Sequence, residues 1–390
     1  MKLIKLIVCG ATAFLPLMLC YTPLRAEVID NCNRIELLTK STELLSGLNV
    51  KQEVECQTLN GADYSLYAAK LSATLNDEAD LRAQEISYKL IGLIPDDYRY
   101  FDCFSGEIGN LSHALYDRNT KKIILRSDTQ IEDKILVHEI LHALQDQHHN
   151  LEQLRSGIKD SDHDLAVSAL IEGQAMVIEE AYLESASVDR KTKLEDSKID
   201  CMPPEPLFSI FLFPYEWGVR FFKIIQKADS DNLERVFSDP PMTTSEVLYP
   251  EEYFARLNSE TLSPKHFLKS SFPDYTKVYS DVLGEYVIRS LFRTRANRTL
   301  AILAGKGWTT DLLELFKNKK DQSYMLLWRI RFAKSHDVKE FLTALKLYSQ
   351  NHFNLPVDLE ATAWVAELPS GLMYEVDSGT DWVSIKYTQL

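Results

Sequence analysis

Two histidines four residues apart, His138 and His142, lie in a stretch whose apolar residues recur at helical spacing. On a helix, side chains at positions i and i+4 share one face, where two imidazoles can bind a single metal ion. Ile131 and Ile135 lie on this face as well, so the histidines are expected to project from the buried side of the helix. The chain must therefore build a core around a metal-binding helix, and this requirement constrains the fold more than any other feature.

The flanking sequence predicts where this helix begins and ends. Thr129 followed by Glu132 forms a capping-box pattern, which predicts a helix that runs to about Gln147. Just before it, Ala114–Asp117 and Lys122–Arg126 flank a turn sequence and are expected to form a β-hairpin. We expect Lys122–Arg126 to be an edge strand, which would bind an extended peptide by strand addition.

A carboxylate follows the first histidine directly, in the pattern His138-Glu139-Ile140-Leu141-His142. Glu139 would lie about 100° around the helix from His138, close enough to hold a water on the metal without being a ligand. Zn²⁺ lowers the pKa of such a water, and the carboxylate takes its proton as the water attacks a carbonyl. The pattern therefore predicts a zinc-dependent peptidase with Glu139 as the general base.

A third metal ligand is expected from a second helix at Asp164–Tyr182. Glu172 lies in a part of this helix that is otherwise apolar or small, where an uncompensated carboxylate is costly. Glu179 and Glu180 are expected on the solvent-facing side. Glu172 is therefore the preferred third ligand.

His148 is the alternative third ligand. It follows His138 by ten residues, the spacing of the third histidine in the pattern H-E-x-x-H-x-x-G-x-x-H. That pattern needs a glycine to turn the chain out of the helix, and Gln145 stands at this position. His148 is therefore expected at the helix end or in the outer surroundings of the metal.

These residues resemble a family of exported bacterial zinc metallopeptidases that are distant relatives of the thermolysin-like gluzincins. The resemblance covers roughly residues 40–350, and its first motif is the specific one. The matching segments, in order, are His138-Glu139-Ile140-Leu141-His142-Ala143-Leu144-Gln145-Asp146-Gln147-His148, Leu170-Ile171-Glu172-Gly173-Gln174-Ala175, Phe213-Pro214-Tyr215 with Gly218, Asp239-Pro240-Pro241-Met242-Thr243-Thr244-Ser245-Glu246, Leu283-Gly284-Glu285 and Gly307-Trp308. The resemblance implies a zincin-like fold in which His138, His142 and Glu172 bind zinc and Glu139 is the general base.

One position departs from the family's pattern. Leu248-Tyr249-Pro250 carries a tyrosine where the family is expected to have a histidine. In related peptidases a His or Tyr outside the metal-binding helix stabilises the oxyanion that forms during attack. Tyr215, Tyr249 and His113 are therefore candidates for this role, with packing in the core or on the surface as the alternative for each.

Residues 1–26 are typical of a signal peptide. Lys2 and Lys5 precede an apolar run at 6–19, and a sequence resembling a cleavage site follows at 24–26. An uncleaved membrane anchor and lipidation at Cys20 are the alternatives. No further integral membrane segment is expected, so we expect export to the periplasm or the cell exterior.

Four cysteines follow this segment, an even number that is typical of disulfides in an exported protein. Three pairings are possible, and Cys32–Cys56 with Cys103–Cys201 is the least entangled. None of the four belongs to a Cys-x-x-Cys pair, so a cysteine zinc site is not expected.

The composition is that of a globular protein, with 390 residues, 45% hydrophobic residues and a net charge of −14. So acidic a surface disfavours nucleic acids and anionic lipids as partners. The expected peptide or protein substrate follows from the peptidase pattern and not from the charge. We expect an α+β fold in which a zincin-like catalytic region at 27–200 is completed by a mainly helical C-terminal region at 201–390. The sequence does not indicate the oligomeric state.

The remaining elements follow from periodicity and turn residues, with a polar loop at 185–200. Strands are expected at Lys51–Cys56, Tyr324–Phe332 and Leu372–Tyr387. Further helices are expected at Leu207–Ala228, Tyr279–Arg293, Thr309–Lys317 and Asp337–Ser349.

Two other functions stay open. The metal site could be structural or could hydrolyse a bond other than a peptide bond. Alternatively, the chain could be a degenerate relative of the peptidases that acts as a binding or envelope-assembly factor. Glu139 argues against the second alternative, because the fold alone does not require a carboxylate beside the first ligand.

Overall fold

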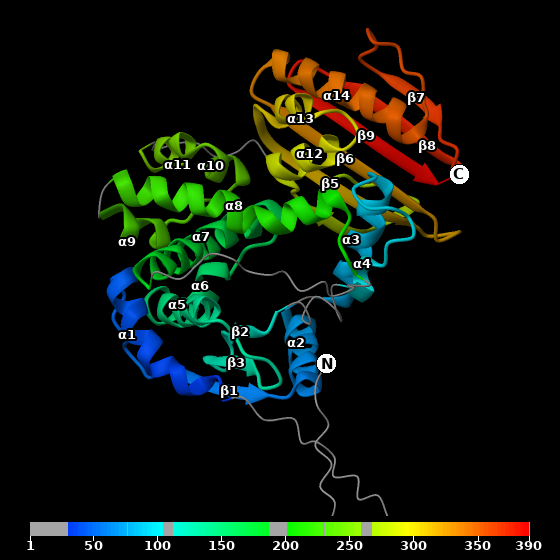
Figure 1. Cartoon of the computed structure of the whole chain (residues 1–390). Helices are drawn as coiled ribbons and strands as arrows, with labels where there is room; N and C mark the ends of the chain where they lie inside the picture. Colours follow the sequence, from blue (N-terminus) through cyan, green and yellow to red (C-terminus); the bar gives the residue numbers. More distant parts are fainter. Residues whose placement is uncertain are drawn as a thin grey trace, which may run out of the picture.

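The computed structural model has an α+β fold (Figure 1). It describes residues 30–75, 77–103, 112–186, 201–228, 231–258 and 267–389. The predicted signal peptide at 1–26 lies outside the described residues, as does 187–200 of the predicted polar loop. None of the helices in the described part of the chain combines the length and hydrophobicity needed to cross a bilayer.

A small sheet contains β1 (Glu55–Leu59), β2 (Ala114–Asp117) and β3 (Lys122–Arg126) in the order β1-β3-β2. β2 and β3 form the predicted antiparallel hairpin, whereas β1 begins later than the strand predicted at 51–56 and pairs parallel with β3. The prediction that Lys122–Arg126 is an edge strand is wrong, because β3 is hydrogen-bonded to a neighbour on both sides. The free edges of this sheet belong to β1 and β2.

The N-terminal part also contains helices, some of which lie beside the small sheet while others pack toward the C-terminal sheet (Figure 1). They are η1 (Cys32–Arg34), α1 (Ile35–Ser46), α2 (Gly61–Leu75), α3 (Glu78–Leu90), α4 (Tyr100–Asp102), α5 (Asp133–His149), α6 (Leu151–Arg155) and α7 (Ser161–Ser185). α1, α5 and β3 share a core that includes Ile35, Leu125, Leu136 and Ile140. α5 is therefore fixed against the sheet on one side, and α7 packs on it from the other.

The helix that carries His138 and His142, α5, starts at Asp133, and the predicted capping box of Thr129 and Glu132 is absent. Glu132 occupies the N-cap position but makes no side-chain cap hydrogen bond. Asn31 binds the preceding segment instead: its amide group donates to the Thr129 carbonyl at 2.9 Å and accepts the Ile131 N–H at 3.3 Å. Asn31, about a hundred residues earlier in the chain, thus holds the segment before α5 in place of a capping residue close by.

α8 (Glu205–Ala228) crosses α7 at a contact between glycines. A Cβ at Gly173 of α7 would lie 2.3 Å from the Gly218 backbone, and a Cβ at Gly218 would lie 2.2 Å from the Ala169 carbonyl oxygen. Only glycine, which has no Cβ, permits this approach. α8 is followed by α9 (Asp231–Ser238), α10 (Thr244–Leu248) and α11 (Pro250–Leu257).

The C-terminal part contains a six-stranded antiparallel sheet with the order β4-β5-β6-β9-β8-β7. The strands are β4 (Tyr275–Asp281), β5 (Trp308–Asn318), β6 (Tyr324–Phe332), β7 (Trp364–Glu367), β8 (Leu372–Ser378) and β9 (Trp382–Gln389). Three helices pack against it: α12 (Gly284–Arg293), α13 (Arg298–Gly305) and α14 (Ser335–Phe353) (Figure 1). The expectation of a mainly helical C-terminal region therefore missed a large sheet.

Two predicted helices of this region are wrong in whole or in part. Thr309–Lys317 is not a helix but most of β5, a strand buried on both faces and paired with β4 and β6. At Tyr279–Arg293 the helix begins only at Gly284, because the Asp311 carboxylate accepts the N–H groups of Leu283 and Gly284 at 3.0 and 2.9 Å. The strand predicted at Tyr324–Phe332 and the helix predicted at Asp337–Ser349 are confirmed, whereas Leu372–Tyr387 is a hairpin of β8 and β9.

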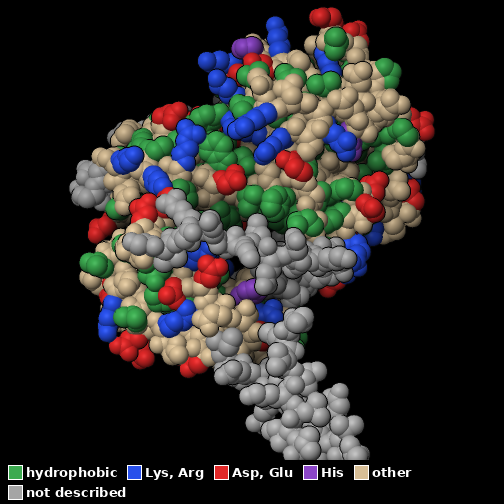
Figure 2. Space-filling view, viewed as in Figure 1, with side chains coloured by type: hydrophobic (Ala, Val, Ile, Leu, Met, Phe, Trp, Pro, Cys, Tyr) green, Lys and Arg blue, Asp and Glu red, His purple; other side chains and the backbone are tan. Residues whose placement is uncertain are grey.

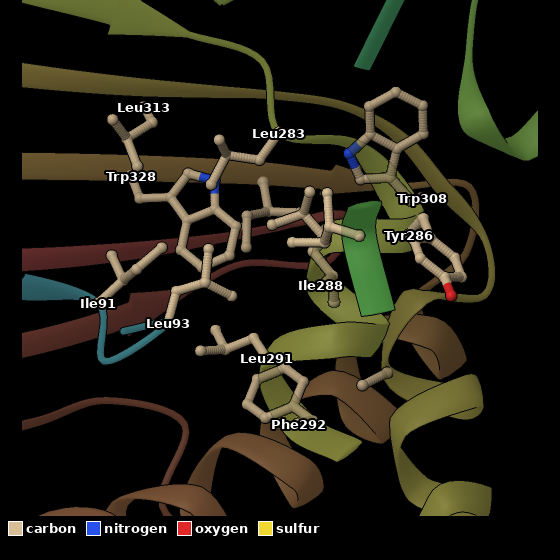
Figure 3. Close-up of a cluster of buried hydrophobic side chains, with 14 of the residues drawn as sticks. Ile91, Leu93, Leu283, Tyr286, Ile288, Leu291, Phe292, Trp308, Leu313 and Trp328 are labelled. Carbon is tan, nitrogen blue, oxygen red and sulfur yellow. The ribbon is translucent and has the colours of Figure 1, made fainter. Parts of the chain in front are cut away.

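One large hydrophobic core connects the C-terminal sheet to the N-terminal part. Ile91 and Leu93, which follow α3, lie beside Trp328 of the sheet and Leu291 of α12 (Figure 3). All four are almost fully buried. The C-terminal part therefore packs against the N-terminal part.

Both expected disulfides, Cys32–Cys56 and Cys103–Cys201, are present, with Cα–Cα distances of 5.7 and 5.4 Å. The first ties η1 to β1, and the second ties the end of α4 to the segment before α8. Disulfides of this kind are typical of proteins that fold outside the reducing cytoplasm.

Candidate metal centre

Three side chains from two helices meet as the sequence predicts. His138 and His142 project from α5, and Glu172 projects from α7, with one ligand atom of each lying within 4.8 Å of the others. Glu172 Oε2 lies 3.1 Å from His138 Nε2 and 3.5 Å from His142 Nε2. Within the described ranges, no other group of three His, Cys, Asp or Glu side chains is brought together in this way.

The three side chains are half-buried but reachable. The side chains of His138, His142 and Glu172 are 13%, 12% and 20% exposed. Burial raises the pKa of Glu172, but the charge of His142 and the hydrogen bonds to both imidazoles outweigh burial and hold this pKa well below its usual range. Glu172 is therefore an anion that faces two imidazoles, which is a donor set suited to a divalent cation.

The outward-facing ring nitrogens also fit a metal site. Nδ1 of His142 lies 2.8 Å from Gln145 Oε1, and Nδ1 of His138 lies 3.4 Å from Glu179 Oε2. With Nδ1–H donated to these oxygens, each Nε2 could bind a metal once it has lost any proton of its own. Burial lowers the pKa of His138, but its hydrogen bonds with Glu172 and Glu179 raise it to about 10, so a metal would bind here by displacing a proton. Two imidazole nitrogens and one carboxylate match the three protein ligands of catalytic zinc sites.

Glu179 and Gln145 are the contacts that sequence reasoning missed. Glu179 was expected on the solvent side of α7, but its carboxylate faces His138. Its spacing of seven residues from Glu172 was the available signal, because positions i and i+7 of a helix lie on the same face. In the sequence analysis Gln145 was noted only because it stands at the glycine position of the alternative pattern, and its contact with His142 was not predicted.

Glu139 lies between the histidines and the small sheet. Its carboxylate accepts a hydrogen bond from the backbone N–H of Tyr116 in β2, and burial raises its pKa. The Arg126 N–H donates to the His113 carbonyl at 3.0 Å, so His113 bonds toward β3. In an antiparallel pair every second residue does so, and Leu115 and Asp117 therefore bond toward β3 as well. Because alternate residues of an edge strand bond outward, Ala114 and Tyr116 present their backbone groups away from β3, and the Tyr116 N–H is the one that binds this carboxylate.

Of the three candidates for oxyanion stabilisation, the structure brings Tyr215 to the triad. The charge of Glu172, the partial burial of the side chain and the charge of Glu139 all raise the pKa of Tyr215, so its hydroxyl lies within electrostatic range of both carboxylates. α8 carries Tyr215 to this position, three residues before the Gly218 contact. Figure 2 shows hydrophobic side chains gathered over the middle of this face, where α8 runs, and Phe208 and Tyr215 are exposed residues of this helix.

The other candidates lie elsewhere. Tyr249 packs over the Arg289 guanidinium and donates to Glu285 at 3.3 Å, in a separate charged cluster. His113 is exposed, directly precedes β2, and acts electrostatically on Asp128. His148 Nε2 lies 2.7 Å from the Asn49 carbonyl oxygen at the end of α5.

Comparison with known proteins finds a match only for the part of the chain that contains the C-terminal sheet. A family model described as a domain of unknown function (DUF8575) matches residues 273–385, from just before β4 into β9. The candidate metal centre lies outside this match. No curated protein and no solved structure matches the chain.

Proposed function

We propose that this protein is an exported zinc-dependent metallopeptidase with a zincin-like active site. The observation that carries the proposal is the convergence of His138, His142 and Glu172, with Glu139 beside them at the free edge of β2. The partial exposure of the three ligands favours a catalytic site over a structural one, since structural zinc sites are closed by four protein ligands.

Zinc held by His138, His142 and Glu172 would polarise the scissile carbonyl and lower the pKa of the attacking water. Glu139 would accept the proton of this water and pass it to the leaving amine. Its raised pKa suits this role, because a base that must also act as an acid works best when its pKa lies close to the working pH.

The substrate would bind as an extended strand along β2 and not along β3. The outward backbone groups of Ala114 and the outward carbonyl of Tyr116 would form the ladder, because the Tyr116 N–H already binds Glu139, and the peptide would lie next to this carboxylate. Tyr215 would donate a hydrogen bond from its hydroxyl group to the oxyanion. The raised pKa of Tyr215 keeps its hydroxyl proton in place at neutral pH.

Export is supported by the two disulfides and by the signal-peptide pattern of residues 1–26. A chain with a core of this size does not need disulfides in order to fold. Their presence is explained if the protein folds in an oxidising compartment, where cysteine pairs become oxidised.

The decisive experiment is elemental analysis of the purified mature protein for zinc. We expect one zinc per chain in the wild type, loss of zinc in Glu172→Ala, and full retention in the matched control His148→Ala, whose imidazole contacts Asn49 instead. Peptide hydrolysis should then fall by a factor of about 10²–10⁴ in Glu139→Gln, with zinc content unchanged. A wild-type protein that takes up no zinc on reconstitution would refute the proposal.

A further inference from the structure

Gln145 is the most deeply buried polar side chain beside the metal centre, with no exposed surface. Its Oε1 accepts from His142 Nδ1 at 2.8 Å. Its Nε2 donates to the Ile171 carbonyl at 3.0 Å and to Gln174 Oε1 at 2.8 Å. Every polar group of this amide is therefore used, and all of its partners lie on α5 or α7.

These contacts fix which way the amide points. If the amide were rotated by half a turn, Oε1 would face two oxygen atoms, those of Ile171 and Gln174, and Nε2 would face His142. Two unpaired acceptors would then meet in a buried site, which is a costly arrangement. Since Nε2 must face the oxygens, Oε1 must face His142, and this oxygen can only accept a proton from the ring.

We propose that Gln145 is a positioning residue that holds His142 in the Nδ1–H tautomer and aims its Nε2 at the metal. The inference rests on the proposed zinc function and adds to it a residue that ties one ligand of α5 to the backbone of α7. The ring of His138 is oriented by an anion, Glu179, at a longer distance of 3.4 Å. His142 is therefore the imidazole that is held by a neutral amide group, and this amide is itself fixed by its hydrogen bonds to Ile171 and Gln174.

This role explains the residue that stands where a glycine would end the helix. A glycine at 145 would let the chain turn and bring His148 to the metal. With Gln145 bonded across to α7, α5 instead continues to His149 and carries His148 to Asn49.

The test measures zinc affinity by competition with a chelator, in the full mature chain, for the wild type, Gln145→Leu and the control Gln147→Leu. Gln147 lies on the same helix but accepts the Lys51 N–H at 2.8 Å, away from the metal centre. We expect Gln145→Leu to bind zinc about 10–100-fold more weakly, as for other groups that orient metal-binding histidines, and Gln147→Leu to bind like the wild type. In the zinc-loaded wild type, the His142 Nδ1–H should give a slowly exchanging proton resonance that Gln145→Leu lacks.

Near-UV circular dichroism checks that Gln145→Leu is folded, and Gln145→Met, which keeps the shape of the side chain, replaces it if it is not. Unchanged affinity together with a retained Nδ1–H resonance in these variants would overturn the positioning role while leaving the zinc function intact. A wild type without zinc would instead overturn the proposed function, and the inference with it.

Discussion

The glycine contact between α7 and α8 allows a sharp test of how Tyr215 is positioned. In Gly218→Ala the new Cβ would lie 2.2 Å from the Ala169 carbonyl oxygen and 3.1 Å from the Gly173 Cα, whereas ordinary contacts begin at 3.4 Å. The obstructing atoms are backbone atoms that cannot rotate away. The helices must therefore separate by about 1 Å in a core that is close-packed.

Overpacking of this kind costs about 1–3 kcal/mol, and its backbone origin places it at the upper end. The better helix propensity of alanine offsets about 1 kcal/mol, which leaves a net loss of about 2 kcal/mol in the free energy of unfolding. For a chain of this size the thermal midpoint should fall by about 2–3 °C. Because Tyr215 lies one turn away, a shift of about 1 Å should also lower kcat/KM by about 10²-fold.

The assay combines thermal unfolding, peptide hydrolysis and zinc analysis of Gly218→Ala. Zinc content should stay that of the wild type, because all three ligands lie on α5 and α7. The matched control is Gly61→Ala, where the added Cβ meets only the flexible side chains of Asp128 and Arg126 and should change stability by less than about 0.5 kcal/mol. A Gly218→Ala protein as stable and as active as the wild type would refute the reasoning.

Two further predictions concern single groups. Tyr215→Phe should lower kcat by about 10²–10³-fold while KM and zinc content stay constant; an unchanged kcat in steady-state kinetics would exclude the hydroxyl from oxyanion stabilisation. Burial raises the pKa of Asp281 to about 6 in the folded protein, above its usual value of 3.8, so folding binds a proton more tightly. The resulting stabilisation is complete below about pH 4 and is lost as the pH rises through 6. Denaturant unfolding between pH 4 and 7 should therefore show a fall of up to about 3 kcal/mol in the wild type that Asp281→Asn lacks, and equal slopes in both proteins would contradict the assignment.

The grouping of the three candidate ligands could be predicted from the sequence because its geometry is local. The spacing of His138 and His142 on one helix is set by the helical repeat alone. Glu172 was identified from the cost of a lone carboxylate among apolar neighbours, and the structure places it against both histidines. Glu179 escaped because a carboxylate near the end of a helix looks the same whether it faces water or an imidazole.

The sheets were harder to predict because strand order depends on contacts between distant residues. β3 was predicted as a strand, but its central position in the sheet was not. That position results from its pairing with β1, which lies more than sixty residues earlier in the chain. β5 has no alternation of polar and apolar residues, because Glu314 on its second face is buried and paired with Lys277 at 3.3 Å and Arg329 at 3.0 Å. The start of α5 was misplaced because Asn31, and not a nearby residue, binds the preceding segment.

The Cys103–Cys201 disulfide closes a covalent ring of chain with a sequence separation of 98. This ring contains β2, β3, α5 and α7, and hence His138, Glu139, His142 and Glu172. A single peptide-bond break anywhere inside it would leave both pieces joined as one molecule of nearly unchanged mass. Cleavage during maturation or by a neighbouring molecule would therefore be invisible on a non-reducing gel and would appear as two fragments only after reduction, while the metal ligands stayed on covalently linked pieces.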